Sequence, residues 1–210
     1  MSDENVQTKN LPKVIEELEK KCEELPDNVV AHHHLAVVYR LAGRTDDALR
    51  MLERCLEIDP QADQALVNIG AIYFEAGEFD KAMTANEQAL KILPNSAEAH
   101  ANLGMIWWQK GDGEKSTASY KEALRNDPQM VSAWAGLTSA HIMTGKLTEA
   151  LEAAKEGIKI DPDFPMGQNN LAVALFYNND FTGAKTAAEK AKELGFPVDP
   201  RFFEAINKEI

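Results

Sequence analysis

The chain has 210 residues, of which 44% are apolar and 27% charged, a composition typical of a folded domain and not of a disordered or membrane-embedded chain. The formal net charge is −12, without a basic stripe, so nucleic acids and anionic membranes are disfavoured as partners. No run approaches the ~18 consecutive apolar residues of a membrane span, so we expect no membrane insertion.

The N-terminus is polar and is followed by one amphipathic helix. Residues 1–10 lack the apolar core of a signal peptide, so we expect a disordered segment and a cytoplasmic protein. Residues 11–28 form the next element, with Val14, Ile15, Leu18 and Cys22 along one stripe and a proline near its end. This helix lacks a preceding partner helix, so oligomerisation through it is an open alternative.

From residue 29 the chain repeats with a period of 34 residues. The period is marked by Pro26, Pro60, Pro94, Pro128 and Pro162. A fixed period of this length is typical of a solenoid of stacked units. We predict five units, at residues 29–62, 63–96, 97–130, 131–164 and 165–198.

Each unit is predicted to be a helix, a tight turn and a second helix. Both halves carry apolar residues at helical spacing. The turn residue is one that tolerates positive φ, as expected after a helix C-terminus: Gly43, Gly77, Gly111, Gly145 and Asn179. Small residues in the first helix allow close approach to the second: Ala36, Gly70, Gly104, Thr138 and Ala172. Residues 199–210 form a closing helix, whose Phe202, Phe203 and Ile206 cover the last unit.

The units resemble the tetratricopeptide repeat. Residues 97–130 show this best, with signature residues at Leu103, Gly104, Trp107, Gly111, Tyr120, Ala123 and Pro128. Departures are Ser116 and Gly157 for alanine, Asn86 for an aromatic residue, and His141 and Leu175 for tyrosine. The resemblance implies an all-α fold: a right-handed α-solenoid of antiparallel helix pairs, with five tetratricopeptide units between an N-terminal half-repeat and a C-terminal capping helix.

The sequence offers no set of residues for catalysis. Patterns such as G-x-S-x-G, H-E-x-x-H and the phosphate-binding loop are absent. His32, His33 and His34 are consecutive, so they lie about 100° apart around a helix and do not converge on one metal ion. Cys22 and Cys55 lack CxxC spacing, and we interpret them as reduced packing residues. We therefore expect no enzyme activity, no cofactor and no metal site.

The resemblance implies a concave groove lined by the first helix of every unit. The predicted lining residues are Val37, Arg40, Asn68, Ala71, Phe74, Asn102, Met105, Trp108, Ser139, Ile142, Asn170, Val173 and Phe176. The asparagines resemble a ladder that holds an extended peptide backbone in some family members; the alternative is that they only cap or solvate their own helices. For Phe74, Trp108 and Phe176 the alternative role is packing on a neighbouring residue, and for Met105 and Met143 it is filling gaps in the core.

The predicted function is a non-catalytic adaptor or scaffold that binds an apolar or amphipathic protein segment in this groove. The lysine and arginine clamp with which some family members hold a C-terminal carboxylate is missing, so a partner recognised by a free carboxylate is not expected. Two alternatives stay open. One is a self-assembling scaffold that uses the N-terminal half-repeat, and the other is a dedicated chaperone for an apolar client protein.

Overall fold

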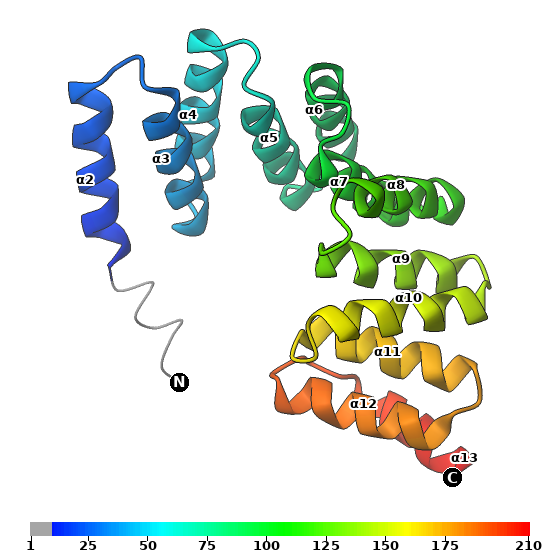
Figure 1. Cartoon of the computed structure of the whole chain (residues 1–210). Coiled ribbons are helices and arrows are strands. Elements are labelled where there is room, and N and C mark those ends of the chain that lie inside the picture. The colour runs from blue at the N-terminus through cyan, green and yellow to red at the C-terminus, as the bar shows by residue number, and fades with distance from the viewer. Residues whose placement is uncertain (1–9) are drawn as a thin grey trace. The chain divides into compact units, whose positions relative to one another are not determined.

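The structure is a computed structural model that describes residues 10–210, in which helices are the only regular elements (Figure 1). The predicted disordered N-terminus lies outside this part of the chain, except for Asn10 at the start of the first helix. The chain divides after Pro94 into two units, Met1–Pro94 (unit 1) and Asn95–Ile210 (unit 2), and each is described by itself.

Unit 1 contains the unpaired N-terminal helix and two helix pairs. Its elements are α2 (Leu11–Glu24), α3 (Val29–Leu41), α4 (Thr45–Ile58), α5 (Asp63–Glu75) and α6 (Phe79–Ile92). Unit 2 contains three helix pairs and a final helix, namely α7 (Ala97–Gln109), α8 (Gly113–Asn126), α9 (Val131–Met143), α10 (Leu147–Ile160), α11 (Pro165–Tyr177), α12 (Phe181–Glu193) and α13 (Pro200–Glu209). The five first helices, α3, α5, α7, α9 and α11, each have 13 residues. The fold is therefore all-α and built from stacked helix pairs, as the sequence predicts.

The turns between paired helices depend on left-handed backbone. All five predicted residues have positive φ, from 64° at Asn179 to 78° at Gly111, and Gly195 adds a sixth after α12. The Gly111 N–H donates to the carbonyl of Trp108, which closes the end of α7. These local rules fix where each first helix stops.

Paired helices approach closely because the contact positions are small. In α7 the Gly104 carbonyl accepts a hydrogen bond from the Ser116 hydroxyl in α8 at 2.8 Å. The ring of Tyr120 lies directly over Gly104, and its other end lies against Gly136 in the next first helix, α9. Tyr120 is 7% exposed and therefore joins two successive repeats of unit 2.

Three of the prolines that mark the repeat period also take part in a hydrogen bond through their carbonyl groups. The Pro26 carbonyl lies 2.9 Å from Nε2 of His32, Pro128 accepts from the indole of Trp134, and Pro162 accepts from the amide of Gln168. These donors occupy the same position in three first helices, so a ring or amide N–H there ties the helix to the preceding turn. The buried His32 is thus a structural residue.

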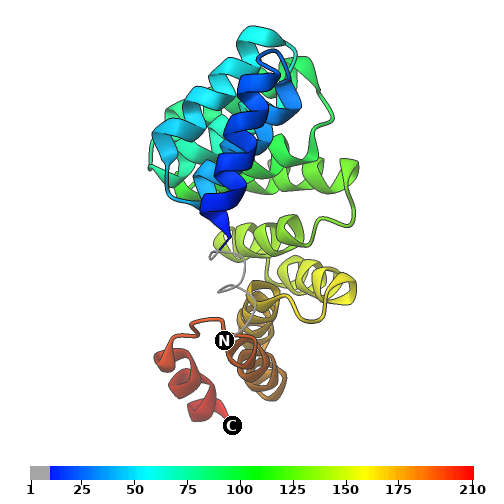
Figure 2. The same cartoon turned by 90° about the vertical axis from the view of Figure 1, so that its left-hand side faces the viewer.

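Helix α2 packs against the first repeat, and Figure 2 views the chain from the side of α2. Ile15 and Cys22 are buried in the core of unit 1. The Tyr39 hydroxyl donates to Glu19 at 2.5 Å, and burial together with this contact raises the pKa of Tyr39 to about 12. Cys22 and Cys55 are buried free thiols, and burial raises the pKa of Cys55 to about 11.

Helix α13 packs on the last repeat. Ile206 is fully buried, and Phe202 and Phe203 lie against the same apolar cluster. The ring of Phe202 meets that of Phe176 at a centroid distance of 5.5 Å. Asp199 caps the N-terminus of α13 by accepting from the Arg201 N–H.

Candidate functional site

The predicted groove residues all lie on the first helices, and all keep part of their side chain at the surface. The thirteen predicted residues and Gly136 form three rows, which we call together the first-helix face of each unit. The row at the middle of the helices is Val37, Ala71, Met105, Ser139 and Val173, the row near their C-terminal ends is Arg40, Phe74, Trp108, Ile142 and Phe176, and the polar row is Asn68, Asn102, Gly136 and Asn170.

Trp108 is the most exposed member of this face, at 39%. The neighbouring Trp107 is instead half-buried, and its ring carries the ammonium of Lys115 at 4.2 Å. The two adjacent tryptophans therefore differ in role: one is held within its own repeat, and the other presents apolar surface.

The exposed large apolar residues that lie within the repeat helices are all on first helices. They are Val30 and Leu41 in α3, Trp108 in α7, Met143 in α9, and Met166 and Tyr177 in α11. Within the described second helices no large apolar residue belongs to this class, although Leu93, at 39%, directly follows α6. Exposed apolar surface gathered on one kind of helix indicates a binding surface.

Sequence reasoning missed four of these residues: Val30, Leu41, Met166 and Tyr177. Leu41, Met143 and Tyr177 are the last residues of their helices, each one position after a member of the predicted C-terminal row. The side chain at that position is exposed because the first helix ends there and the following turn leads away from it to the second helix. The signal available in the sequence for Leu41 and Tyr177 was this position of the repeat, which holds a large apolar residue in three of the five units and Glu75 and Gln109 in the other two.

The asparagine row makes hydrogen bonds between neighbouring first helices. The Asn68 amide nitrogen donates to Nε2 of His33 at 2.9 Å, and the Asn170 amide nitrogen donates to the Ala135 carbonyl at 2.9 Å. Asn170 also donates to the Ser139 hydroxyl at 3.0 Å. In Asn68 and Asn170 the side-chain carbonyl oxygen is therefore the group left to meet a partner.

Gly136 interrupts the asparagine row for a steric reason. A Cβ atom at this position would lie 2.2 Å from Cζ of Tyr120 and 2.6 Å from its hydroxyl oxygen. The tyrosine thus occupies the space that an asparagine side chain needs. The row therefore does not form a continuous ladder through unit 2.

Two aromatic residues of the C-terminal row pack on their own repeats. Phe74 meets Phe79 and Phe176 meets Phe181, each with ring centroids 5.5 Å apart. Phe79 and Phe181 both begin the second helix that follows. Phe74 and Phe176 therefore combine a packing role with a half-exposed edge.

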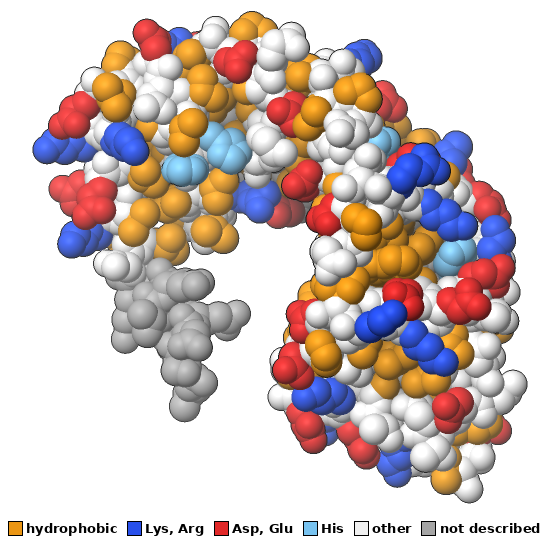
Figure 3. All heavy atoms as spheres, viewed as in Figure 1, with side chains coloured by type: hydrophobic (Ala, Val, Ile, Leu, Met, Phe, Trp, Pro, Cys, Tyr) orange, Lys and Arg blue, Asp and Glu red, His pale blue; other side chains and the backbone are white. Residues whose placement is uncertain are grey.

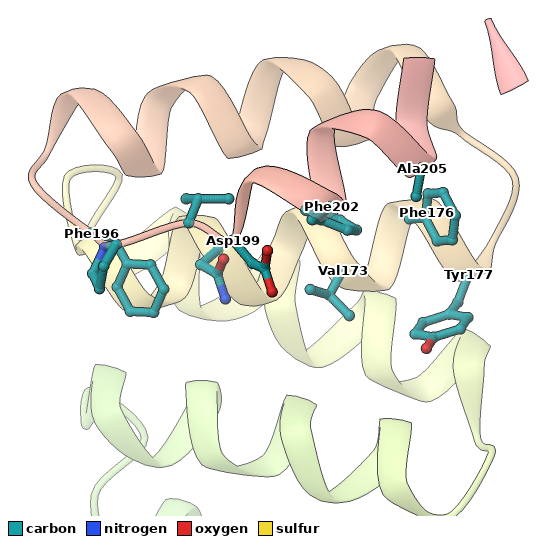
Figure 4. A pocket seen from close by; sticks show the side chains of 10 residues that line it. Val173, Phe176, Tyr177, Phe196, Asp199, Phe202 and Ala205 are labelled. Carbon is teal, nitrogen blue, oxygen red and sulfur yellow. The ribbon is translucent and has the colours of Figure 1, made fainter. Parts of the chain in front are cut away.

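A hollow of about 520 Å³ lies beside α11, between this helix and the segment that leads into α13. Figure 4 shows Val173, Phe176, Tyr177 and Phe202 around it, with Asp199 and Phe196 at one side. Its walls are mainly apolar, and Asn169 and Asp199 supply polar groups. The hollow extends the first-helix face of unit 2 at its last repeat.

No group of three histidine, cysteine, aspartate or glutamate side chains is arranged for a metal ion within residues 10–210. None of the helices in that range is both long and apolar enough to cross a membrane. The residues of the first-helix face offer apolar contact, hydrogen bonding to amide side chains and, at Arg40, a positive charge.

His141 is a buried ionisable group in α9, with 4% of its surface exposed. Burial lowers its pKa most; Lys121 and Lys146 lower it further, while Glu149 and Glu114 act in the opposite sense. Its Nδ1 atom has no hydrogen-bond partner. Protonation would therefore place a poorly compensated charge in the core of unit 2.

Unit 2 is accordingly expected to lose stability as the pH falls below about 6.5, the ordinary histidine value. Below that pH the unfolded chain binds a proton at His141 that the folded chain excludes. The contribution of neutral His141 to the free energy of unfolding is therefore complete above about pH 6.5 and declines as the pH falls to the lowered pKa of the folded state. The free energy of unfolding, measured with denaturant at about pH 7.5 and about pH 5.5, should fall less between the two pH values for His141→Phe than for the native chain. Equal pH dependence in the two proteins contradicts this expectation.

The tetratricopeptide-repeat family model matches the chain over residues 39–106 and again over residues 73–140. No curated protein sequence matches it. Among solved structures, the chain is similar to a chain of the APC/C hetero-tetramer Cut9-Hcn1, with a TM-score of 0.85 and 13% identity, over 97% of this chain and 40% of that one. It thus spans less than half of that longer structure.

Two further structures match over most of their own length. PilF of Pseudomonas aeruginosa has a TM-score of 0.77 and 19% identity, over 86% of this chain and 83% of that one. YrrB, described as a TPR protein with an unusual peptide-binding site, has a TM-score of 0.65 and 19% identity, over 91% and 97% of the two chains. At these identities the likeness shows the fold.

Proposed function

We propose that this chain, which belongs to the tetratricopeptide-repeat family, is a non-catalytic cytoplasmic adaptor that binds an apolar or amphipathic segment of another protein on its first-helix face. Proteins of this repeat class bind other proteins, and YrrB is described as having a peptide-binding site. The observation that carries the proposal is the concentration of exposed large apolar side chains on first helices, where six of the seven such residues in the repeats lie; the seventh, Leu93, directly follows α6.

Unit 2 offers the larger apolar surface. Trp108, Met143, Met166 and Tyr177 are each between 38% and 50% exposed. Tryptophan and tyrosine are enriched among residues that dominate binding energy, and methionine adapts its shape to a partner. The remaining predicted residues, including Asn170 with its side-chain carbonyl oxygen, are proposed to complete the contact with a segment laid across successive first helices.

The test is the affinity of a partner recovered by pull-down from the source organism. Replacing Trp108 with alanine is expected to weaken binding by about 30-fold, or about 2 kcal/mol, if the indole is a central anchor. Leu93→Ala is the matched control, because Leu93 is also 39% exposed but lies at the end of a second helix. Helicity and melting should change little in both variants.

Salt separates apolar binding from charge attraction. Exposed ion pairs are screened beyond a Debye length of about 8 Å at physiological ionic strength, whereas apolar contact is not. The affinity is therefore expected to hold between low and high salt. Binding that collapses in salt, or that Trp108→Ala and Met143→Ala both leave intact, places the interface away from the apolar residues of the first-helix face and removes this proposal.

The chaperone alternative uses the same surface and makes a different prediction about the partner. A client that depends on this chain aggregates without it and stays soluble when bound, whereas an adaptor's partner is stable alone. Solubility of the recovered partner with and without the chain distinguishes the two roles.

A further inference from the structure

Helix α2 stands at the second-helix position of a repeat whose first helix is not among the described residues. Its bounds, Leu11 and Glu24, lie 34 residues before those of α4, because 45 − 11 and 58 − 24 are both 34. Each residue of α2 can therefore be compared with its equivalent in the five complete repeats.

Two positions of α2 differ from every other second helix. At the first, the complete repeats have fully buried small residues: Ala48, Ala82, Ser116, Ala150 and Ala184. At the second they have small buried residues again: Cys55, Ala89, Ala123, Gly157 and Ala191. In α2 these positions hold Val14, which is half-buried, and Lys21, which is exposed.

Val14 and Lys21 determine which kind of helix or partner can pack on this side of α2. A first helix packed at the usual short distance would press on Val14 and bury the ammonium of Lys21, and burial of an unpaired charge is costly. The face is therefore not shaped for a missing helix of the ordinary repeat type. It suits an occupant that supplies apolar contact together with a carboxylate for Lys21.

The face itself is an apolar hollow with charges at its edge. A space of about 490 Å³ lies between α2 and α3 and is lined by Val14, Glu17, Leu18, Lys21, His34, Val37 and Val38. Val30 and Leu41 extend it along α3, at 60% and 67% exposure. Figure 3 shows hydrophobic side chains in orange beside the pale-blue histidines on the surface formed by these helices.

Helix α2 also carries a seam of the kind that pairs helices. Leu11, Val14, Leu18, Lys21 and Leu25 follow alternating steps of three and four residues, while Ile15 and Cys22 are the residues buried against unit 1. Leu25 is 48% exposed. Leu18 packs partly on the core of unit 1, Leu11 and Val14 are partly exposed, and Lys21 and Leu25 are exposed. The seam therefore lies beside the buried stripe and presents a partly exposed edge to a second helix.

We propose that this face binds the same face of a second copy of the chain, with the two α2 helices antiparallel about a two-fold axis near Leu18. In such an interface residue i contacts j and j contacts i. Glu17 and Lys21 have opposite charge and lie one turn apart, so the two-fold axis brings Glu17 of each copy to Lys21 of the other. The charges at the edge of the hollow are therefore self-complementary, and this complementarity favours a second copy over an unrelated partner.

Ion pairing of Glu17 and Lys21 within one chain does not compete strongly with this contact. Glu17 lies 3.8 Å from Lys13 in an exposed pair on the same helix, and such pairs contribute little. Among the described residues, Lys21 has no ion-pair partner in its own chain. Both side chains can therefore turn to a second copy without loss of a strong interaction.

The test is a charge exchange followed by light scattering over a range of protein concentrations. The native chain is expected to rise from 23.2 kDa toward twice that mass. Glu17→Lys and Lys21→Glu should each weaken self-association by at least about tenfold, because like charges then meet twice across the axis. An equimolar mixture of the two variants should associate again, since both contacts in the mixed dimer join opposite charges.

The matched control exchanges Glu16→Lys and Lys20→Glu, which have the same spacing and charge changes but lie on the opposite, exposed side of α2. These variants should associate like the native chain. A native chain that stays monomeric at high concentration overturns the proposal, as do single variants that dimerise normally or a mixture that stays monomeric. Circular dichroism on each variant verifies that the exposed substitutions leave the helices intact.

Discussion

Replacing Gly136 with alanine is expected to destabilise unit 2 by about 3 kcal/mol, at the upper end of the usual cost of overpacking a core. The new Cβ would lie 2.2, 2.4 and 2.6 Å from three atoms at the end of the Tyr120 side chain. The ring cannot retreat, because its other atoms lie over Gly104. Relief of the clash therefore requires the two first helices to separate.

Gly111→Ala is the matched control for this substitution. Gly111 has a φ of 78°, and no atom lies within 4 Å of an added Cβ, so alanine costs only the strain of left-handed backbone, about 1 kcal/mol. Adding Gly136→Ala to a Tyr120→Leu background should cost far less than adding it to the native chain. An equal cost in both backgrounds contradicts the steric account.

Tryptophan fluorescence is the measurement for these variants. Trp107, Trp108 and Trp134 are the only tryptophans of the chain, and all three lie in unit 2. Denaturant unfolding followed by fluorescence therefore reports unit 2, while circular dichroism reports both units. The comparison shows whether a substitution acts on the unit that contains it.

Removal of residues 199–210 is expected to destabilise unit 2 by about 3 kcal/mol or more and to cause aggregation. The deletion exposes the apolar surface that Ile206, Phe202 and Phe203 now contact, including the ring of Phe176. Melting should fall by several degrees, and light scattering should show large particles.

A shorter deletion tests whether the loss comes from this contact. Residues 208–210 are exposed, so a chain that ends at Asn207 should keep the stability and mass of the native protein. Ile206→Ala in the full chain should cost about 2 kcal/mol through the cavity that it leaves. An unchanged melt and a monodisperse product after removal of residues 199–210 refute the capping role.

The sequence by itself determined the helices, the turns and their order. The 34-residue period, the residues that tolerate positive φ at Gly43 to Asn179, and the helical spacing of apolar residues are local signals, and each acts within one repeat. The family resemblance then placed the candidate residues on the first helices. The packing of His32 against Pro26 and the role of Tyr120 between two glycines were not visible, because these contacts join residues of different helices or turns.

Only the tertiary structure decided how the candidate face is used within each unit. Asn68 and Asn170 hydrogen-bond to residues 31 to 35 positions earlier, and Gly136 yields its space to Tyr120, so one row in the sequence has three different environments. Trp107 and Trp108 are adjacent and identical in type, yet Lys115 covers one and leaves the other exposed. The exceptional character of Val14 and Lys21 in α2 became visible only by comparison with the equivalent residues of the other second helices, which the structure shows to be small and buried. The physical reason is common to all these cases: a repeat pattern specifies which positions face a neighbour, but the side chain of that neighbour decides whether a position is packed, hydrogen-bonded or open.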